Sequence, residues 1–133
     1  MRTPVTIPKA VYEEIVVQGK PGAQEVAKSD WIKTEVVKNK KDINKLPRRL
    51  GVGEREAIIL AKELNGFLLI DDSLGRKKAE ELKIKFTGTL GILKEAKTKN
   101  LISEAKPVLD ELIFSGLRLS LKLYEEFLKK IRE

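Results

Sequence analysis

The sequence predicts an α/β protein built on a parallel sheet. The run "FLLID", residues 67 to 71, is apolar without alternation, which is typical of a strand buried on both faces. Before it, residues 53 to 65 carry apolar side chains at helical spacing, and "NG" at 65 and 66 ends that helix. Strand-like and helix-like segments alternate along much of the chain, and this order favours parallel strands joined by helices, in a doubly wound arrangement.

The other elements follow from local patterns. A short strand at 3–7 stops at Pro8, and a helix over 8–18 ends at Gly19. "GKPGAQ" predicts a turn-rich loop, and the partly alternating residues 30–37 predict an edge strand. Further helices are expected at 43–49, 73–82, 89–97, 104–115 and 120–131, and one more strand at 84–88. Ser120 is the expected cap of the last helix.

Length and composition indicate one globular domain spanning residues 1–133. The chain has 35% charged and 41% hydrophobic residues, and its apolar runs are too short to cross a bilayer, so we expect a cytoplasmic protein without a membrane partner. It contains no cysteine and no histidine. Thiolate and imidazole chemistry are therefore excluded. Carboxylates, lysines, hydroxyls and oxygen-bound cations such as Mg²⁺ or Mn²⁺ remain.

Positive charge is concentrated in one segment. The formal net charge is +7, and residues 38–49, "KNKKDINKLPRR", hold six bases and one acid. Such a charge pattern favours an anionic partner, most often nucleic acid. The candidate contacts in this basic segment are Lys38, Lys40, Lys41, Arg48 and Arg49. A solvated, mobile loop is the alternative interpretation of the same residues.

Acidic residues from separate segments are expected at one edge of the sheet. Asp71 and Asp72 end the strand "FLLID", and ligands of open α/β sheets bind outside the carboxyl ends of strands. The helix over 53–65 runs antiparallel to that strand, so its first turn, with Glu54 and Glu56, lies at the same edge. The sequence thus predicts at least two acidic segments that meet.

The helix over 8–18 adds a third acidic segment to this edge. Glu14 lies about 60° from the buried Val11 on the helical wheel, whereas Glu13 points towards solvent. Carboxylates gathered in a partly buried place repel one another unless a cation is bound between them. The alternative is that Asp72 and Ser73 simply cap the following helix.

Several stretches together resemble the PIN-domain superfamily. They are "VTIPKAVYEEIV", "SDWI", the run from "GEREAIILAKELNGFLLIDDSLGRKKAEE" to "TGTLGIL", and the closing "KPVLDELIFSGLRLSLKLYEEFLKKI". The resemblance covers nearly the whole chain, and "IDDSLGRKKAEE…TGTLGIL" is its most specific part. It is greatest to a branch of small prokaryotic proteins related to the toxins of toxin–antitoxin pairs. The implied fold is a PIN-like three-layer α/β fold with a parallel sheet.

The resemblance also implies a site and an activity. PIN domains are ribonucleases that gather acids around Mg²⁺ or Mn²⁺, and the matching motifs give the catalytic and metal-binding roles to Glu14, Glu56 and Asp72. Asp71 would be a neighbouring metal ligand. Arg76 and Lys77, together with the basic segment, would contact the backbone of RNA.

One part of the family pattern has no counterpart. The chain begins at "MRTPVTIP", which matches the family's second strand, so the first strand with its acid and the first helix are missing. That strand normally lies between the strands matched by 3–7 and 67–71, and an unfilled slot would expose unpaired backbone. The start of the sequence is incomplete, or the flanking strands close together, or another chain covers the slot. We expect a homodimer or an antitoxin-type partner on these grounds.

Two main functions therefore stay open at this stage. The first is a PIN-like protein descended from a Mg²⁺/Mn²⁺-dependent RNA endonuclease, with activity impaired by the missing acidic strand. The second is a non-catalytic nucleic-acid-binding or protein-interaction module. A phosphoacceptor domain of the receiver type is a remote third, because it requires a lysine at the end of a late strand, and Lys85 lies inside its strand.

Overall fold

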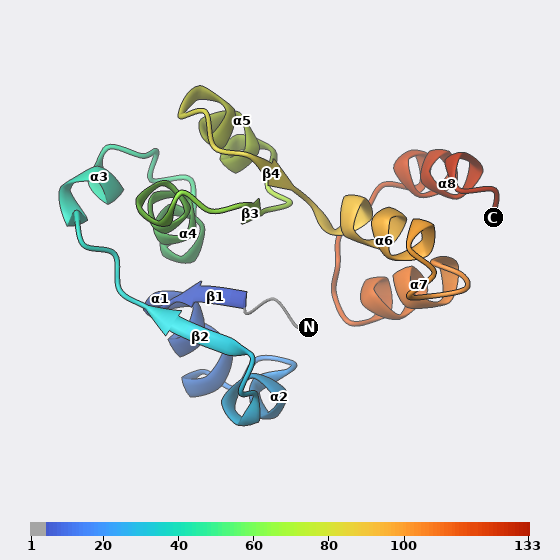
Figure 1. Cartoon of the computed structure of the whole chain (residues 1–133), viewed down its shortest axis with the longest axis horizontal. Coiled ribbons are helices and arrows are strands. Elements are labelled where there is room, and N and C mark those ends of the chain that lie inside the picture. Colours follow the sequence, from blue (N-terminus) through green and yellow to red (C-terminus); the bar gives the residue numbers. More distant parts are fainter. Residues whose placement is uncertain (1–4) are drawn as a thin grey trace. The chain divides into compact units, whose positions relative to one another are not determined.

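The computed structural model describes residues 5–133, whose contacts group into two compact units, Met1–Thr87 and Gly88–Glu133 (Figure 1). The expected single domain over the whole chain stays a prediction.

The first unit contains alternating short strands and helices, as an α/β protein should. Its strands are β1 (Val5–Pro8), β2 (Ile32–Glu35), β3 (Leu68–Leu69) and β4 (Phe86–Thr87). Its helices are α1 (Lys9–Tyr12), the π-helical η1 (Glu13–Val17), α2 (Ala23–Lys28), α3 (Lys40–Asn44), α4 (Val52–Leu64) and α5 (Ser73–Glu81). The α/β class with parallel strands is confirmed.

The strands of the described residues pair two by two. β1 pairs with β2 in parallel, from Val5 opposite Ile32 to Pro8 opposite Glu35, and β3 pairs with β4 in parallel. No ladder joins β1 to β3 among residues 5–133, so the strands do not form the single sheet that the alternation of elements predicts. Residues 3 and 4 of the expected first strand lie outside the described residues.

Two helical segments differ from the predictions. Residues 23–28, expected partly in a loop, form α2 behind Gly22, whose φ of 88° glycine adopts without strain. The short helix expected at 43–49 instead spans 40–44, because Pro47 excludes the helix from the residues that follow. The predicted helix over 8–18 is present, as α1 continued by η1.

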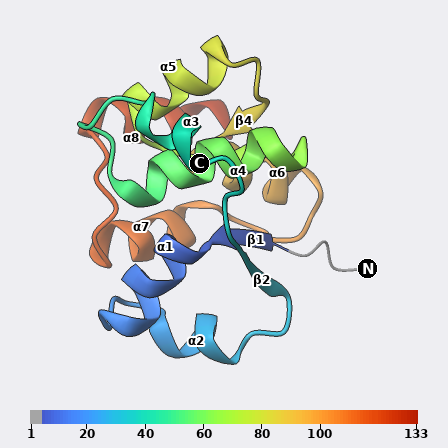
Figure 2. The same cartoon turned by 90° about the vertical axis from the view of Figure 1, so that its left-hand side faces the viewer.

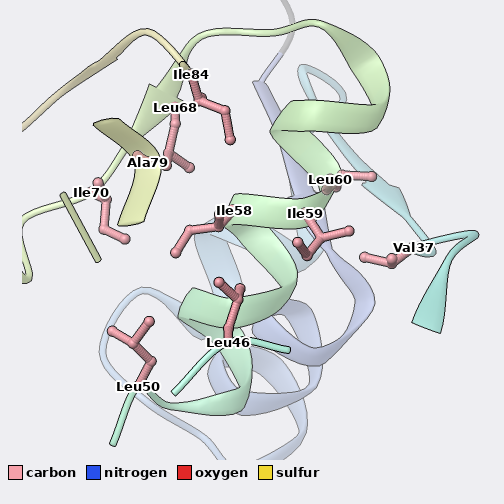
Figure 3. Close-up of a cluster of buried hydrophobic side chains, with 10 residues drawn as sticks. All are labelled: Val37, Leu46, Leu50, Ile58, Ile59, Leu60, Leu68, Ile70, Ala79 and Ile84. Atoms are coloured by element: carbon pink, nitrogen blue, oxygen red, sulfur yellow. The ribbon is translucent and has the colours of Figure 1, made fainter. Parts of the chain in front are cut away.

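The core of the first unit surrounds α4. Ile58 and Ile59 are almost fully buried, and Figure 3 shows them pointing to different sides of the helix. Ile58 points towards Ile70 and its neighbours around β3 and α5, whereas Ile59 points towards Val37. The buried cluster is formed by Val37, Leu46, Leu50, Ile58, Ile59, Leu60, Leu68, Ile70, Ala79 and Ile84. α4 is thus the helix on which the surrounding segments are assembled.

The second unit is helical. It contains α6 (Thr89–Thr98), α7 (Lys106–Phe114) and α8 (Leu121–Lys130), close to the predicted bounds. Their apolar faces meet in a core of Leu93, Ala105, Leu109, Phe127, Leu128 and Ile131. Ser120 caps α8 as expected, since its hydroxyl accepts a hydrogen bond of 3.1 Å from the Leu123 N–H.

The carboxylate of Glu133 links the end of the chain to α6 and to the start of α7. Glu133 accepts hydrogen bonds from the N–H groups of Ala105 and Lys106, at 2.8 and 2.9 Å, just where α7 begins. Its carboxylate also pairs with the Lys97 ammonium at 2.8 Å. The hydrogen bond from Lys97, followed by those from the two backbone groups, holds the pKa of Glu133 at about 2.

A second polar cluster links α7 to α8. Asp110 accepts hydrogen bonds from the Lys106 ammonium, at 2.7 Å, and from the Tyr124 hydroxyl. These bonds, Lys106 first, lower the pKa of Asp110, and the same carboxylate raises the pKa of Lys106.

None of the helices between residues 5 and 133 is long and apolar enough to span a membrane.

Candidate functional site

Asp72 is the N-cap of α5. Its backbone is extended, and its Oδ1 accepts a hydrogen bond of 2.8 Å from the Gly75 N–H. The capping interpretation of "IDDS" is therefore correct for this side chain. Gly75 allows the close packing behind the cap, because a Cβ there would collide with the side chain of Ile70.

Arg76 turns back onto the end of β3 rather than outwards. Its Nε donates a 3.2 Å hydrogen bond to the carbonyl of Ile70, and its guanidinium lies 5.8 Å from the centre of the Phe86 ring. Because Ile70 directly precedes Asp71 and Asp72, this bond places positive charge beside the aspartate pair. Lys77, the neighbouring residue that we expect to contact RNA, is exposed on α5.

An acidic recess of about 210 Å³ lies between η1, α4 and the end of β3. Glu14 and Glu54 both line it, together with Ile70, the residue just before the aspartate pair. No lysine or arginine is among its lining residues, all of which belong to the described part of the chain. We call this the acidic recess.

Glycines bring the two carboxylates to the start of α4. A Cβ built on Gly53 would lie 3.1 Å from the Val11 methyl group and 3.7 Å from a Glu14 carboxylate oxygen. A Cβ on Gly51 would collide with the Glu54 carboxylate, which folds back over the helix start. Glycine at these positions therefore leaves room for the two acids, and the positive end of the helix dipole favours them there.

Glu56 lies elsewhere. It lines a larger recess of about 450 Å³ with Glu13, Lys9, Lys40 and Asn44. Glu14 and Glu56, which the family motifs assign to one site, thus line different recesses. Glu54, which the same motifs pass over, is the acid of α4 that joins Glu14. The signal for it was the glycine on either side of Val52, which marks a close approach at the helix start.

The acids do not form a three-ligand cluster. Within residues 5–133 no group of three or more Asp or Glu side chains is close enough to hold a metal ion. Two carboxylates nevertheless fit Mg²⁺, which typically binds one or two carboxylates and keeps several waters. The donor set of the acidic recess is therefore compatible with a hydrated divalent ion.

The basic segment is ordered on the protein surface. Residues 38–49 follow the buried Val37, and Leu46 is buried within them. α3 lies beside α4 (Figures 1 and 2). All six bases of the segment are exposed, and Lys45 forms an ion pair with Asp42 at 3.2 Å. The segment thus combines the short helix α3 with solvated basic side chains.

A family model described as a PIN domain matches residues 1–133. The chain belongs to the PIN-domain family. Neither the characterised proteins nor the solved structures give a significant match to it. Membership agrees with the mixed α/β fold and its parallel strands, and it indicates nuclease-like ancestry and nucleic-acid binding.

Proposed function

We propose that this PIN domain is a Mg²⁺- or Mn²⁺-dependent endoribonuclease whose reaction takes place at the acidic recess. The observation that carries the proposal is that Glu14 and Glu54 line the same recess as Ile70, at the carboxyl end of β3. This is the end of a parallel strand at which α/β proteins bind their ligands. Asp71 and Asp72 continue the chain from the same point.

The residues of the recess have distinct roles in this proposal. Glu14 and Glu54 hold the cation, and Asp71 and Asp72 supply further negative charge at the strand end. When bound, the divalent ion neutralises the scissile phosphate and lowers the pKa of an attacking water. Asp72 keeps one carboxylate oxygen beyond the one that caps α5, so capping and cation binding are compatible.

The bases are the proposed RNA contacts. Lys38, Lys40, Lys41, Arg48 and Arg49 are exposed along the basic segment, and phosphate contacts of this kind provide affinity without sequence preference. Arg76 places positive charge beside the aspartates, and Lys77 is exposed on the same helix. Since Arg76 already bonds to Ile70, its proposed contribution is a fixed charge rather than a mobile contact.

The test compares three matched substitutions. Glu14→Gln and Glu54→Gln should each abolish saturable Mn²⁺ binding in calorimetry and reduce cleavage of single-stranded RNA by roughly a hundredfold, the size usual for losing an essential electrostatic group. Glu56→Gln should leave both unchanged, because Glu56 lines the other recess. If Glu56→Gln loses as much Mn²⁺ binding and RNA cleavage as Glu54→Gln, Glu54 is not the specific ligand from α4 that we propose. If the unsubstituted chain does not cleave RNA with Mn²⁺, the nuclease proposal is overturned.

We also propose a protein partner for this chain, either a second copy or an antitoxin-type protein. It is supported by the unpaired outer edges of β1 and β3 in the described residues, since exposed strand edges are sites at which another chain pairs. Light scattering after size-exclusion chromatography should give about twice the 15.0 kDa chain mass. A strictly monomeric mass over a wide range of concentrations would exclude the homodimer.

A further inference from the structure

Apolar side chains in and beside the basic segment pack into the core of the first unit. Val37 is 2% exposed at its entrance, Leu46 is 8% exposed within it, and Leu50 is 1% exposed just after it. All three belong to the cluster around α4, and Ile43 of α3 packs against the same cluster. These contacts attach the apolar face of the segment to the core, while its basic side chains are exposed to solvent.

A single carboxylate on α4 fixes the entrance to the segment. Glu63 accepts two hydrogen bonds from the backbone, 2.9 Å from the Lys38 nitrogen to Oε1 and 2.8 Å from the Asn39 nitrogen to Oε2. These residues are 25 and 24 positions away in sequence. Both carboxylate oxygens are therefore engaged by the backbone just ahead of α3, where the chain turns from β2 into the helix. Hydrogen bonds to an ionised carboxylate are about twice as strong as neutral ones.

Glu63 lies where its charge alone would oppose RNA. It is an acid beside a segment with six bases, so on electrostatic grounds its removal should strengthen the attraction for a polyanion. Its two backbone bonds have the opposite consequence, because they order the segment before RNA arrives. Binding then loses less conformational freedom.

We propose that Glu63 is a positioning residue for RNA binding. By clamping the N–H groups of Lys38 and Asn39, it holds the basic segment in the arrangement in which Lys38, Lys40 and Lys41 contact the phosphates of one strand. This inference rests on the proposed function for the identity of the ligand, although it concerns binding and not cleavage. It assigns a role in recognition to an acid whose own charge would repel the nucleic acid.

The experiment measures binding of a fluorescent single-stranded RNA by anisotropy, in EDTA, at several salt concentrations. Glu63→Ala should weaken binding roughly fivefold, the cost of ordering one or two long side chains on association. It should also make the slope of log K against log salt shallower by about 0.7, because one fewer phosphate of the single strand is then neutralised by the protein. Glu63→Gln keeps one acceptor oxygen, so it should recover part of the affinity.

The matched control is Glu35→Ala, which makes the same change of charge three residues before the segment at an exposed position. We expect it to leave RNA affinity unchanged or slightly increased. If Glu63→Ala also binds RNA as tightly as the unsubstituted chain or more tightly, the positioning role is overturned. A loss of affinity with an unchanged salt slope, or with a lowered melting temperature and no recovery in Glu63→Gln, would also overturn it.

The two proposals fail separately. If the chain binds RNA but does not cleave it with Mn²⁺, the nuclease proposal fails while the Glu63 result stands. If cleavage depends on Glu14 and Glu54 but Glu63→Ala has no effect on binding, only the positioning role fails. If the unsubstituted chain does not bind RNA in EDTA, Glu63 has no recognition to support, and the inference is wrong.

Discussion

At the scale of single residues, Asp72 has a structural role, and the proposed function adds a chemical one. One carboxylate oxygen of Asp72 caps α5 through the Gly75 N–H, which accounts for an acid at this position without any cation. The pair "DD" at the end of a strand therefore has a local explanation as well as a functional one. The two explanations differ in what they require of the side chain: a helix cap requires an acceptor oxygen, whereas cation binding requires a negative charge.

Substitutions at Asp72 separate these two requirements. Asp72→Ala should lower the free energy of unfolding by about 1 kcal/mol through the lost cap, and Asp72→Asn should leave it nearly unchanged, because asparagine is an equally good N-cap. Both should weaken Mn²⁺ binding if the carboxylate contributes to the site. Urea denaturation followed by circular dichroism gives the first quantity and calorimetry the second. A stable Asp72→Asn variant that binds Mn²⁺ normally would leave Asp72 with the capping role alone.

At the scale of elements, α4 connects the acidic recess and the basic segment of the first unit. Its first turn presents Glu54 to the acidic recess, and its last turn presents Glu63 to the basic segment. Its middle buries Ile58 and Ile59 among residues from the rest of the unit. A rigid helix that spans both regions fixes their separation, so its packing is a condition for both proposals.

Truncation in the middle of α4 tests its contribution to the fold. Ile58 is fully buried, so Ile58→Ala should lower the free energy of unfolding by about 2–5 kcal/mol through reduced burial and the cavity left behind. Leu64→Ala on the same helix is the control, because that side chain is 51% exposed. Its effect should stay within about 0.5 kcal/mol. Similar losses in the two variants, measured by urea denaturation, would contradict the burial described for α4.

At the scale of the whole molecule, the two units have separate hydrophobic cores, and hydrogen bonds and ion pairs add to the packing of the second. In the second unit, the Glu133 carboxylate accepts a hydrogen bond from the Ala105 N–H at the start of α7 and forms an ion pair with Lys97. Because its pKa is lowered to about 2 in the folded state, ionised Glu133 stabilises the fold. That contribution is fully present above the unfolded value near 4.5 and is lost as pH falls towards 2.

The pH dependence of this tie is measurable. Glu133→Gln should melt at a lower temperature than the unsubstituted chain at pH 7, and the difference should shrink steadily between about pH 4.5 and pH 2. Calorimetric melting curves across that range give the comparison. Glu104→Gln, an exposed acid of the same unit, is the control and should show no such difference. A gap between Glu133→Gln and the parent chain that persists unchanged to pH 2 would rule out the ionised carboxylate as its source.

The sequence by itself determined the α/β class, the bounds of α4 and of the last three helices to within a few residues, and the cap at Ser120. These features depend on local periodicity and on capping residues, which are readable along the chain. It also placed the aspartate pair just after β3 and Glu14 in the helix that follows β1. Local patterns were sufficient there because the direction of consecutive parallel elements is fixed by their order.

Only the tertiary structure decided which acids share a recess and how the strands pair. Glu54 and Glu56 are two residues apart, about 200° around the helix, so one lines the acidic recess and the other the larger recess once α1 packs against α4. The hydrogen bonds that Glu63 accepts from the N–H groups of Lys38 and Asn39 join residues more than 20 positions apart, and no local sequence pattern predicts them. Strand pairing depends in the same way on long-range contacts, which is why the described strands form two parallel pairs where the alternation of elements predicted one sheet.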